Sequence, residues 1–73
     1  MKYIIFDDGL NENPVIFPTH IPHTKVALLP LGEPISAGFL DENLTAGGES
    51  VGLKLKSRPE DTEIIRRLFR AKM

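Results

Sequence analysis

The sequence contains no cysteine and no tryptophan. Without cysteine there is no disulfide, no thiolate ligand for zinc and no cysteine nucleophile, which excludes the usual supports of small secreted folds. No apolar run approaches the ~18 residues that a membrane span needs. The N-terminal segment, Met1 to Asp7, reaches charged residues too early for a signal peptide, whose apolar region covers about 7 to 15 residues. We therefore expect a cytoplasmic protein without a membrane partner.

The chain is too short for more than one domain. It has 73 residues, of which 41% are hydrophobic and 26% charged, as in soluble globular proteins. A domain of this size hides only about 60% of the surface that its unfolded chain exposes. We expect a single domain over residues 1–73 with a narrow margin of stability.

The net charge of −1 conceals two regions of opposite sign. Residues 1–53 carry two basic and seven acidic residues, a net charge of −5, whereas residues 54–73 carry seven basic and three acidic residues, a net charge of +4. The basic end either neutralises the acidic body, within the fold or across a dimer, or binds nucleic acid. We favour the first interpretation, because a nucleic-acid binder usually has an overall basic excess. The candidate binding residues are Lys54, Lys56, Arg58, Arg66, Arg67 and Arg70.

A C-terminal helix near residues 59–71 is the strongest structural signal. Ser57 and Glu60 have the spacing of a capping box, and Pro59 suits a first helical turn. At 100° per residue one side of this helix is apolar and the other is charged. The apolar arc consists of Ile64, Ile65, Leu68, Phe69 and Ala71, and the charged arc of Glu63, Arg66, Arg67 and Arg70. We expect Leu68 to lie in the core and Arg67 in solvent.

The rest of the chain predicts short strands near residues 3–6, 14–17, 35–40 and 50–56. The first two flank Asp7-Asp8-Gly9, a strong turn signal. The last two are expected to pair antiparallel, with alternate side chains turned inward: Ile35, Ala37, Phe39, Val51, Leu53 and Leu55. Five prolines between Pro14 and Pro34 favour a loop crossing with one helical turn near residues 24–29. The expected fold class is α+β, a mainly antiparallel sheet of three to four strands with one helix on one face.

Three short patterns resemble catalytic or ligand-binding motifs. Residues 48–52 match the letters of a serine-hydrolase elbow, but Ser50 opens a strand where that motif needs a strand-to-helix turn. His20 and His23 supply two metal ligands where catalytic zinc needs at least three, so local hydrogen bonding is the alternative. Gly47-Gly48 lacks the Lys-Ser/Thr of a phosphate loop. We assign no catalytic residue, no metal ligand and no cofactor.

Several segments are similar to small proteins encoded by bacterial phages and prophages. They run from Pro14 to Pro18, from Ile35 to Phe39, from Gly48 to Leu53 and from Ser57 to Asp61. None of these segments is diagnostic of an activity, and the resemblance transfers no functional residue. It implies a context in which small proteins are often non-enzymatic binders, among them inhibitors of host defence.

These observations predict a non-enzymatic binding protein that acts through a protein–protein interface and possesses no enzymatic activity. The alternative is a binder of nucleic acid or nucleotide phosphate through the basic C-terminal region. Self-association into a homodimer or small oligomer would cover the edge strands of so short a sheet. Blunting of those edges by the prolines would instead leave a monomer.

Overall fold

A computed structural model describes residues 1–71. Its strands are β1 (Lys2–Asp7), β2 (Glu12–Phe17), β3 (Glu33–Leu40), β4 (Ala46–Gly47), β5 (Glu49–Ser50) and β6 (Leu55–Lys56), and its helices are α1 (His23–Val26) and α2 (Asp61–Ala71). No helix within these residues is long and apolar enough to cross a membrane. The predicted α+β class is confirmed, including the one turn of helix in the proline-rich crossing.

The main sheet has four strands in the order β2-β1-β3-β4, all antiparallel. The predicted hairpin is present: β1 and β2 pair from Lys2 opposite Phe17 to Asp7 opposite Glu12. Asp7 and Asp8 shape the turn, because the Asp7 carboxylate accepts from the Gly9 N–H and the Asp8 carboxylate accepts from the Leu10 N–H. β1 lies between β2 and β3 in the interior of the sheet, and four of its side chains, Tyr3 to Phe6, are fully buried.

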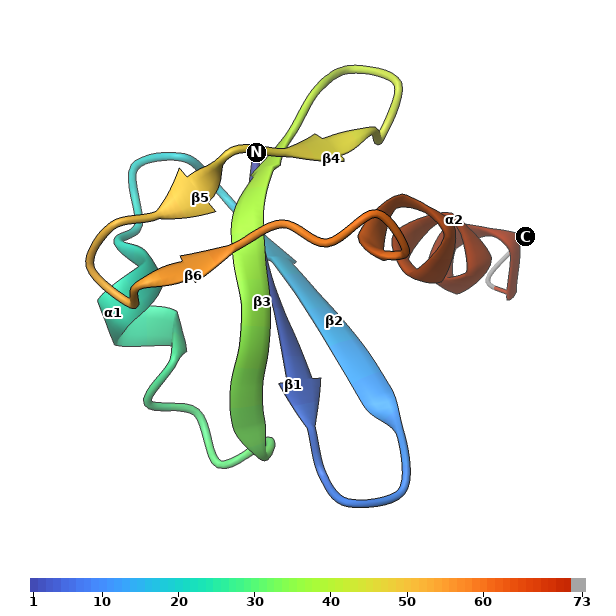
Figure 1. The fold of residues 1–73 in the computed structure, drawn as a ribbon. Coiled ribbons are helices and arrows are strands. Elements are labelled where there is room, and N and C mark those ends of the chain that lie inside the picture. The colour runs from blue at the N-terminus through green and yellow to red at the C-terminus, as the bar shows by residue number, and fades with distance from the viewer. Residues whose placement is uncertain (72–73) are drawn as a thin grey trace.

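Both faces of the sheet are covered (Figure 1). On one face, Ile4 and Phe6 of β1 pack with Val26 of α1 and with the β5–β6 hairpin. On the other face, Tyr3 and Ile5 pack against α2. Successive side chains of a strand point to opposite faces, so the uniformly apolar run of β1 matches its place between two layers.

The predicted strand over residues 50–56 is wrong. Residues 51–54 form a turn, closed by a hydrogen bond from the Lys54 N–H to the Val51 carbonyl, and Lys54 has a positive φ of 57°. Val51 is exposed, while Leu53 and Leu55 pack on the core. The hairpin pairs β5 with β6, and the long partner of β3 is β1. Two leucines two residues apart were therefore a correct signal of burial but not of an extended strand.

The predicted burial of Phe39 is also wrong, since the side chain is 43% exposed although its ring packs edge-on against the buried His23. A separate irregularity moves Ile35 away from the face of the sheet on which Ala37 is buried. β1 and β3 shift register between Ile5, which faces Ser36, and Phe6, which faces Pro34. Ile35 is thereby left without a partner on β1 and lies with the α2 face of the core. Such a bulge places two successive residues on one side of the sheet, which breaks simple alternation along β3.

Helix α2 begins two residues after Pro59, and its cap differs from the predicted one. The Arg58 N–H donates to the Asp61 carboxylate at 2.9 Å, and the Asp61 N–H donates to the Arg58 carbonyl at 3.1 Å. Only one half of a capping box is thus made, one residue later than Ser57 and Glu60 predict: the Asp61 carboxylate accepts from the Arg58 N–H, whereas the arginine side chain has no acceptor to offer in return. The carboxylate that caps the helix is therefore that of the buried Asp61, and the side chain of Glu60 is exposed.

Candidate functional site

A buried carboxylate positions α2 against the sheet. Asp61 is fully buried and accepts hydrogen bonds from the Tyr3 hydroxyl at 2.6 Å and from Arg58 Nε at 2.9 Å. Arg58 Nη2 also donates to the Glu12 carboxylate at 2.7 Å, and this bond holds the pKa of Arg58 above its ordinary value. A buried charge is stable when it is both paired and hydrogen-bonded. The network therefore connects β1, β2 and the start of α2.

The same network predicts that the protein loses folding stability at alkaline pH. Burial, then the hydrogen bond to Asp61 and its negative charge, raise the pKa of Tyr3. The stability that Tyr3 contributes is fully present below the unfolded pKa of about 10 and is lost as the pH rises toward the folded-state value. We expect the free energy of unfolding to fall by about 1.4 kcal/mol per pH unit above that point from this group.

Tyr3 is the single tyrosine in a chain without tryptophan, so the ultraviolet absorbance of tyrosinate reports on it alone. During an alkaline titration, tyrosinate should appear together with loss of the circular dichroism signal. Tyr3→Phe should remove the additional pH dependence. Tyrosinate formed in a protein that is still folded would contradict the prediction.

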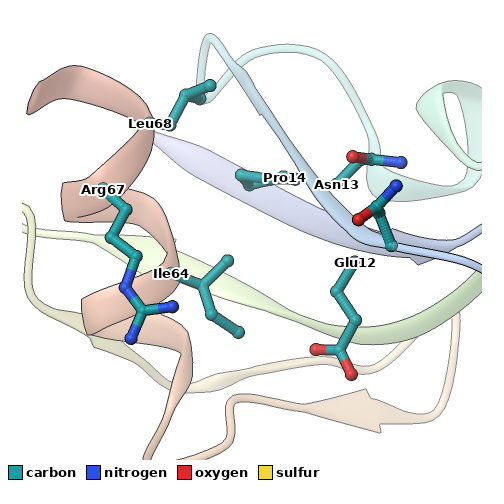
Figure 2. A pocket seen from close by; sticks show the side chains of 7 residues that line it. Glu12, Asn13, Pro14, Ile64, Arg67 and Leu68 are labelled. Atoms are coloured by element: carbon teal, nitrogen blue, oxygen red, sulfur yellow. The ribbon is translucent and has the colours of Figure 1, made fainter. Parts of the chain in front are cut away.

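An open groove lies between α2 and β2. Its volume is about 510 Å³, and Figure 2 shows the side chains of both elements on its two sides. Pro14, Ile64 and Leu68 supply apolar contacts, and Glu12 and Arg67 supply charge. The remaining lining residues are Asn11 and Asn13. The groove thus combines an apolar surface with hydrogen-bonding groups.

The strand beside this groove has an uncovered edge. β2 is the outermost strand of the main sheet and pairs only with β1. Within residues 1–71, its backbone makes no other backbone hydrogen bond. A proline is tolerated in a sheet where its nitrogen faces away from the neighbouring strand, so Pro14 indicates that the backbone groups of Glu12 and Ile16 also face outward. These groups are available to a further strand.

Of the predicted basic residues on α2, only Arg67 lines the groove. Arg67 Nε lies 3.5 Å from the Glu63 carboxylate, which also pairs with Arg70. The hydrogen bond from Arg70, and then the charges of both arginines, lower the pKa of Glu63. Arg66 donates to the Asn43 carbonyl and thereby contacts the β3–β4 connection. The three arginines that appear equivalent in sequence therefore have different surroundings.

The structure does not bring the six predicted basic residues together on one surface. Lys54 and Lys56 belong to the β5–β6 hairpin, on the face of the sheet opposite α2. Arg58 belongs to the buried network, with Asp61 and Glu12 as its partners. Lys72, which contributes to the basic end of the sequence, lies outside the described residues.

The two histidines have unlike positions. His23 is buried, its Nε2 lies 3.0 Å from the Gly38 carbonyl oxygen, and its ring lies edge-on between Phe17 and Phe39. His20 is exposed. Within residues 1–71, no three His, Cys, Asp or Glu side chains are grouped so as to hold a metal ion. Ser50 is buried and its hydroxyl accepts from the Leu53 N–H, so this serine caps the turn of the β5–β6 hairpin.

Sequence patterns alone did not indicate the groove, although one signal was present. A proline inside a strand marks an edge, and Pro14 lies inside β2, although the predicted strand near residues 14–17 begins at this proline. Nothing local indicated that Ile64 and Leu68 of α2 would lie beside this edge. No family model matches the chain, and neither the curated proteins nor the solved structures include a significant match to it.

Proposed function

We propose that this protein is a non-enzymatic binding module that holds an extended segment of a partner protein in the groove between β2 and α2. The uncovered edge of β2 beside an open groove carries the proposal. Unpaired backbone groups at a sheet edge are a template for another strand. Extended peptides use such edges by forming main-chain hydrogen bonds, while neighbouring pockets select their side chains.

The groove has surfaces for both apolar and acidic side chains of the peptide. Ile64 and Leu68 are half-buried and, with Pro14, form a surface on which an apolar side chain of the peptide would lose its contact with water. Arg67 remains largely exposed, with 73% of its side chain accessible, and suits a carboxylate of the peptide. Pro14 removes one backbone donor from the edge, which limits uncontrolled pairing with other chains.

The surroundings of the charged lining residues support binding without catalysis. A general base must reach the proton that it removes, and a nucleophile needs an adjacent base. Glu12, the one carboxylate of the groove lining, is held by Arg58 at 2.7 Å. The separation of Lys54 and Lys56 from the arginines of α2 likewise favours a protein partner over a nucleic acid, which needs a continuous basic surface.

Selection of peptides from a random display library on the immobilised protein tests the proposal. Nuclear magnetic resonance of the ¹⁵N-labelled protein with a selected peptide should show its largest amide shifts in residues 11–13 and 64–68. The amides of Glu12 and Ile16 should exchange more slowly with solvent, because they gain hydrogen bonds to the peptide. Shifts confined to other residues would refute a groove site.

Substitutions at Arg67 and at Arg70 give a matched pair of variants. Both contact Glu63, but only Arg67 lines the groove. Arg67→Glu should weaken binding of an acidic selected peptide about tenfold, because a favourable charge contact becomes repulsive. Arg70→Glu should change it little. Equal losses of peptide affinity in the two variants would indicate a general charge effect and contradict a groove site. Sedimentation of the free protein would show whether a second copy of the chain occupies the edge of β2 instead.

A further inference from the structure

A second cavity lies on the face of the sheet opposite α2 and the groove. Its volume is about 410 Å³, within the range of about 300 to 1,000 Å³ that is typical of small-molecule sites. Its walls come from the start of β1, from α1, from β3 and from the β5–β6 hairpin. Figure 1 shows α1 and this hairpin side by side, and a Cβ added to Gly52 of the hairpin would stand 3.0 Å from Thr24 Cγ2.

The cavity-lining His23 has a polar atom without a partner. The residue is only 7% exposed, and its Nε2 lies 3.0 Å from the Gly38 carbonyl oxygen. A carbonyl oxygen only accepts, so Nε2 carries the proton and Nδ1 of the neutral ring is an acceptor. Within residues 1–71, Nδ1 receives no hydrogen bond, and the only side-chain polar atom that is both unpartnered and sealed from solvent is Ser36 Oγ. Nδ1 can therefore be reached from the cavity that His23 lines.

The His23 ring is held in place for such a contact. It lies edge-on to Phe17 and to Phe39, with ring centroids 5.4 Å and 5.6 Å away. Both phenylalanines stand opposite Lys2 in the strand register, one on β2 and one on β3. Directly paired residues of neighbouring strands point to the same face, so Lys2 belongs to this cluster. Little rotational freedom of the ring remains to be lost when a ligand binds.

Lys2 supplies a positive charge beside this ring. Its side chain is half-buried, and Nζ donates to the Ile21 carbonyl at 3.2 Å and lies 6.0 Å from the centroid of the Phe39 ring. No ion pair within residues 1–71 involves Lys2. A partly desolvated ammonium group gains more from an anion than an exposed one does. The cavity therefore favours a ligand with a negative charge.

Glu49, an acidic residue at the cavity, does not occupy this position. It adjoins Ser50, whose side chain is buried, and successive side chains of a strand point to opposite faces. Glu49 is exposed and stands opposite Lys56, which is also exposed. Its carboxylate is therefore directed to the outer side of the β5–β6 hairpin.

We propose that this cavity binds a small carboxylic acid that has an apolar body and a hydroxyl or amino donor beside the carboxylate. The carboxylate pairs with the Lys2 ammonium group, and the donor bonds to His23 Nδ1. The apolar body covers the Phe39 ring, which remains 43% exposed. Lys2 Nζ and the His23 ring centroid both lie within 6.0 Å of the Phe39 ring centroid, so a compact ligand spans the two polar groups.

Mandelate, mandelamide and phenylacetate test this ligand chemistry, because they share a phenyl group and differ in one polar group each. Their affinities are measured by nuclear magnetic resonance titration of the ¹⁵N-labelled protein. Mandelate should bind about tenfold more tightly than the neutral mandelamide, and this preference should shrink with added salt. It should also bind more tightly than phenylacetate, which lacks the donor. Equal affinities for mandelate and mandelamide, or no saturable shift at millimolar concentrations, would overturn the proposal.

Two lysine variants separate the site from the overall charge. Lys2→Met keeps the length of the side chain and should abolish the preference for mandelate over mandelamide. Lys25→Met removes the same charge from an exposed position outside the cavity lining and should leave the preference unchanged. Equal effects of the two variants would contradict a site at Lys2. Arg67→Glu in the groove should not alter mandelate binding, so the two sites are tested independently.

The imidazole resonances report on the second contact without a substitution. The ¹⁵N resonance of His23 Nδ1 should move when mandelate binds and should stay nearly unchanged with phenylacetate, which has no hydroxyl group to donate. His20 is the internal control, because it is exposed and does not line the cavity. Equal movement of the two histidines, or an equal response of His23 to mandelate and phenylacetate, would refute the hydrogen bond to Nδ1.

Discussion

Replacing Asp61 by alanine is expected to unfold most of the protein at neutral pH. The substitution leaves the Tyr3 hydroxyl and the Arg58 N–H without their acceptor and deprives the Arg58 guanidinium of its buried partner. Removing one member of a buried ion pair typically costs about 3–5 kcal/mol. A core of this size supplies only about 3–5 kcal/mol in total. Urea unfolding followed by circular dichroism should therefore show little or no folded baseline.

Glu60→Ala is the matched control for Asp61. Glu60 is the neighbouring acidic residue and the one that the capping-box pattern predicts, yet its side chain is exposed. We expect its replacement to change the free energy of unfolding by about 0.5 kcal/mol or less. A larger loss for Glu60→Ala than for Asp61→Ala would mean that the helix is capped as the sequence pattern predicts.

Ile65→Ala is expected to have the second largest effect. Ile65 of α2 is fully buried and packs in one cluster with Tyr3, Ile5 and Leu40. Truncating a buried isoleucine to alanine costs about 2–5 kcal/mol, because transfer free energy is lost and a cavity remains. The midpoint of urea unfolding should fall sharply or the folded baseline should disappear.

Leu68→Ala and Arg67→Ala calibrate this effect on the same helix. Leu68 is only half-buried, although the helical pattern predicts it to lie in the core, so we expect a smaller loss than at Ile65. Arg67 is exposed, and its replacement should change stability by about 0.5 kcal/mol or less. A loss for Leu68→Ala as large as that for Ile65→Ala would show that α2 is rotated relative to the described packing.

Local patterns determined the secondary structure where a single periodicity extended over a whole element. The turn residues Asp7 and Gly9 between two apolar runs specified the β1–β2 hairpin, and the 3.6-residue period specified α2. Both signals depend on residues that are neighbours in sequence. The same reasoning was wrong for residues 50–56, since a tight turn that packs Leu53 and Leu55 on the core satisfies the same alternation as a strand.

Tertiary structure alone decided which charged groups are buried and which edge of the sheet stays unpaired. The Tyr3–Asp61 hydrogen bond joins residues 58 positions apart, and the Glu12–Arg58 ion pair joins residues 46 positions apart. No local pattern encodes such contacts, because they depend on how α2 and the hairpins dock on the two faces of the sheet. That docking buries Ile65 deeper than Leu68 and places Lys54 away from Arg67. It also leaves the edge of β2 beside an open groove, because α2 covers one face of the sheet without pairing with its outermost strand.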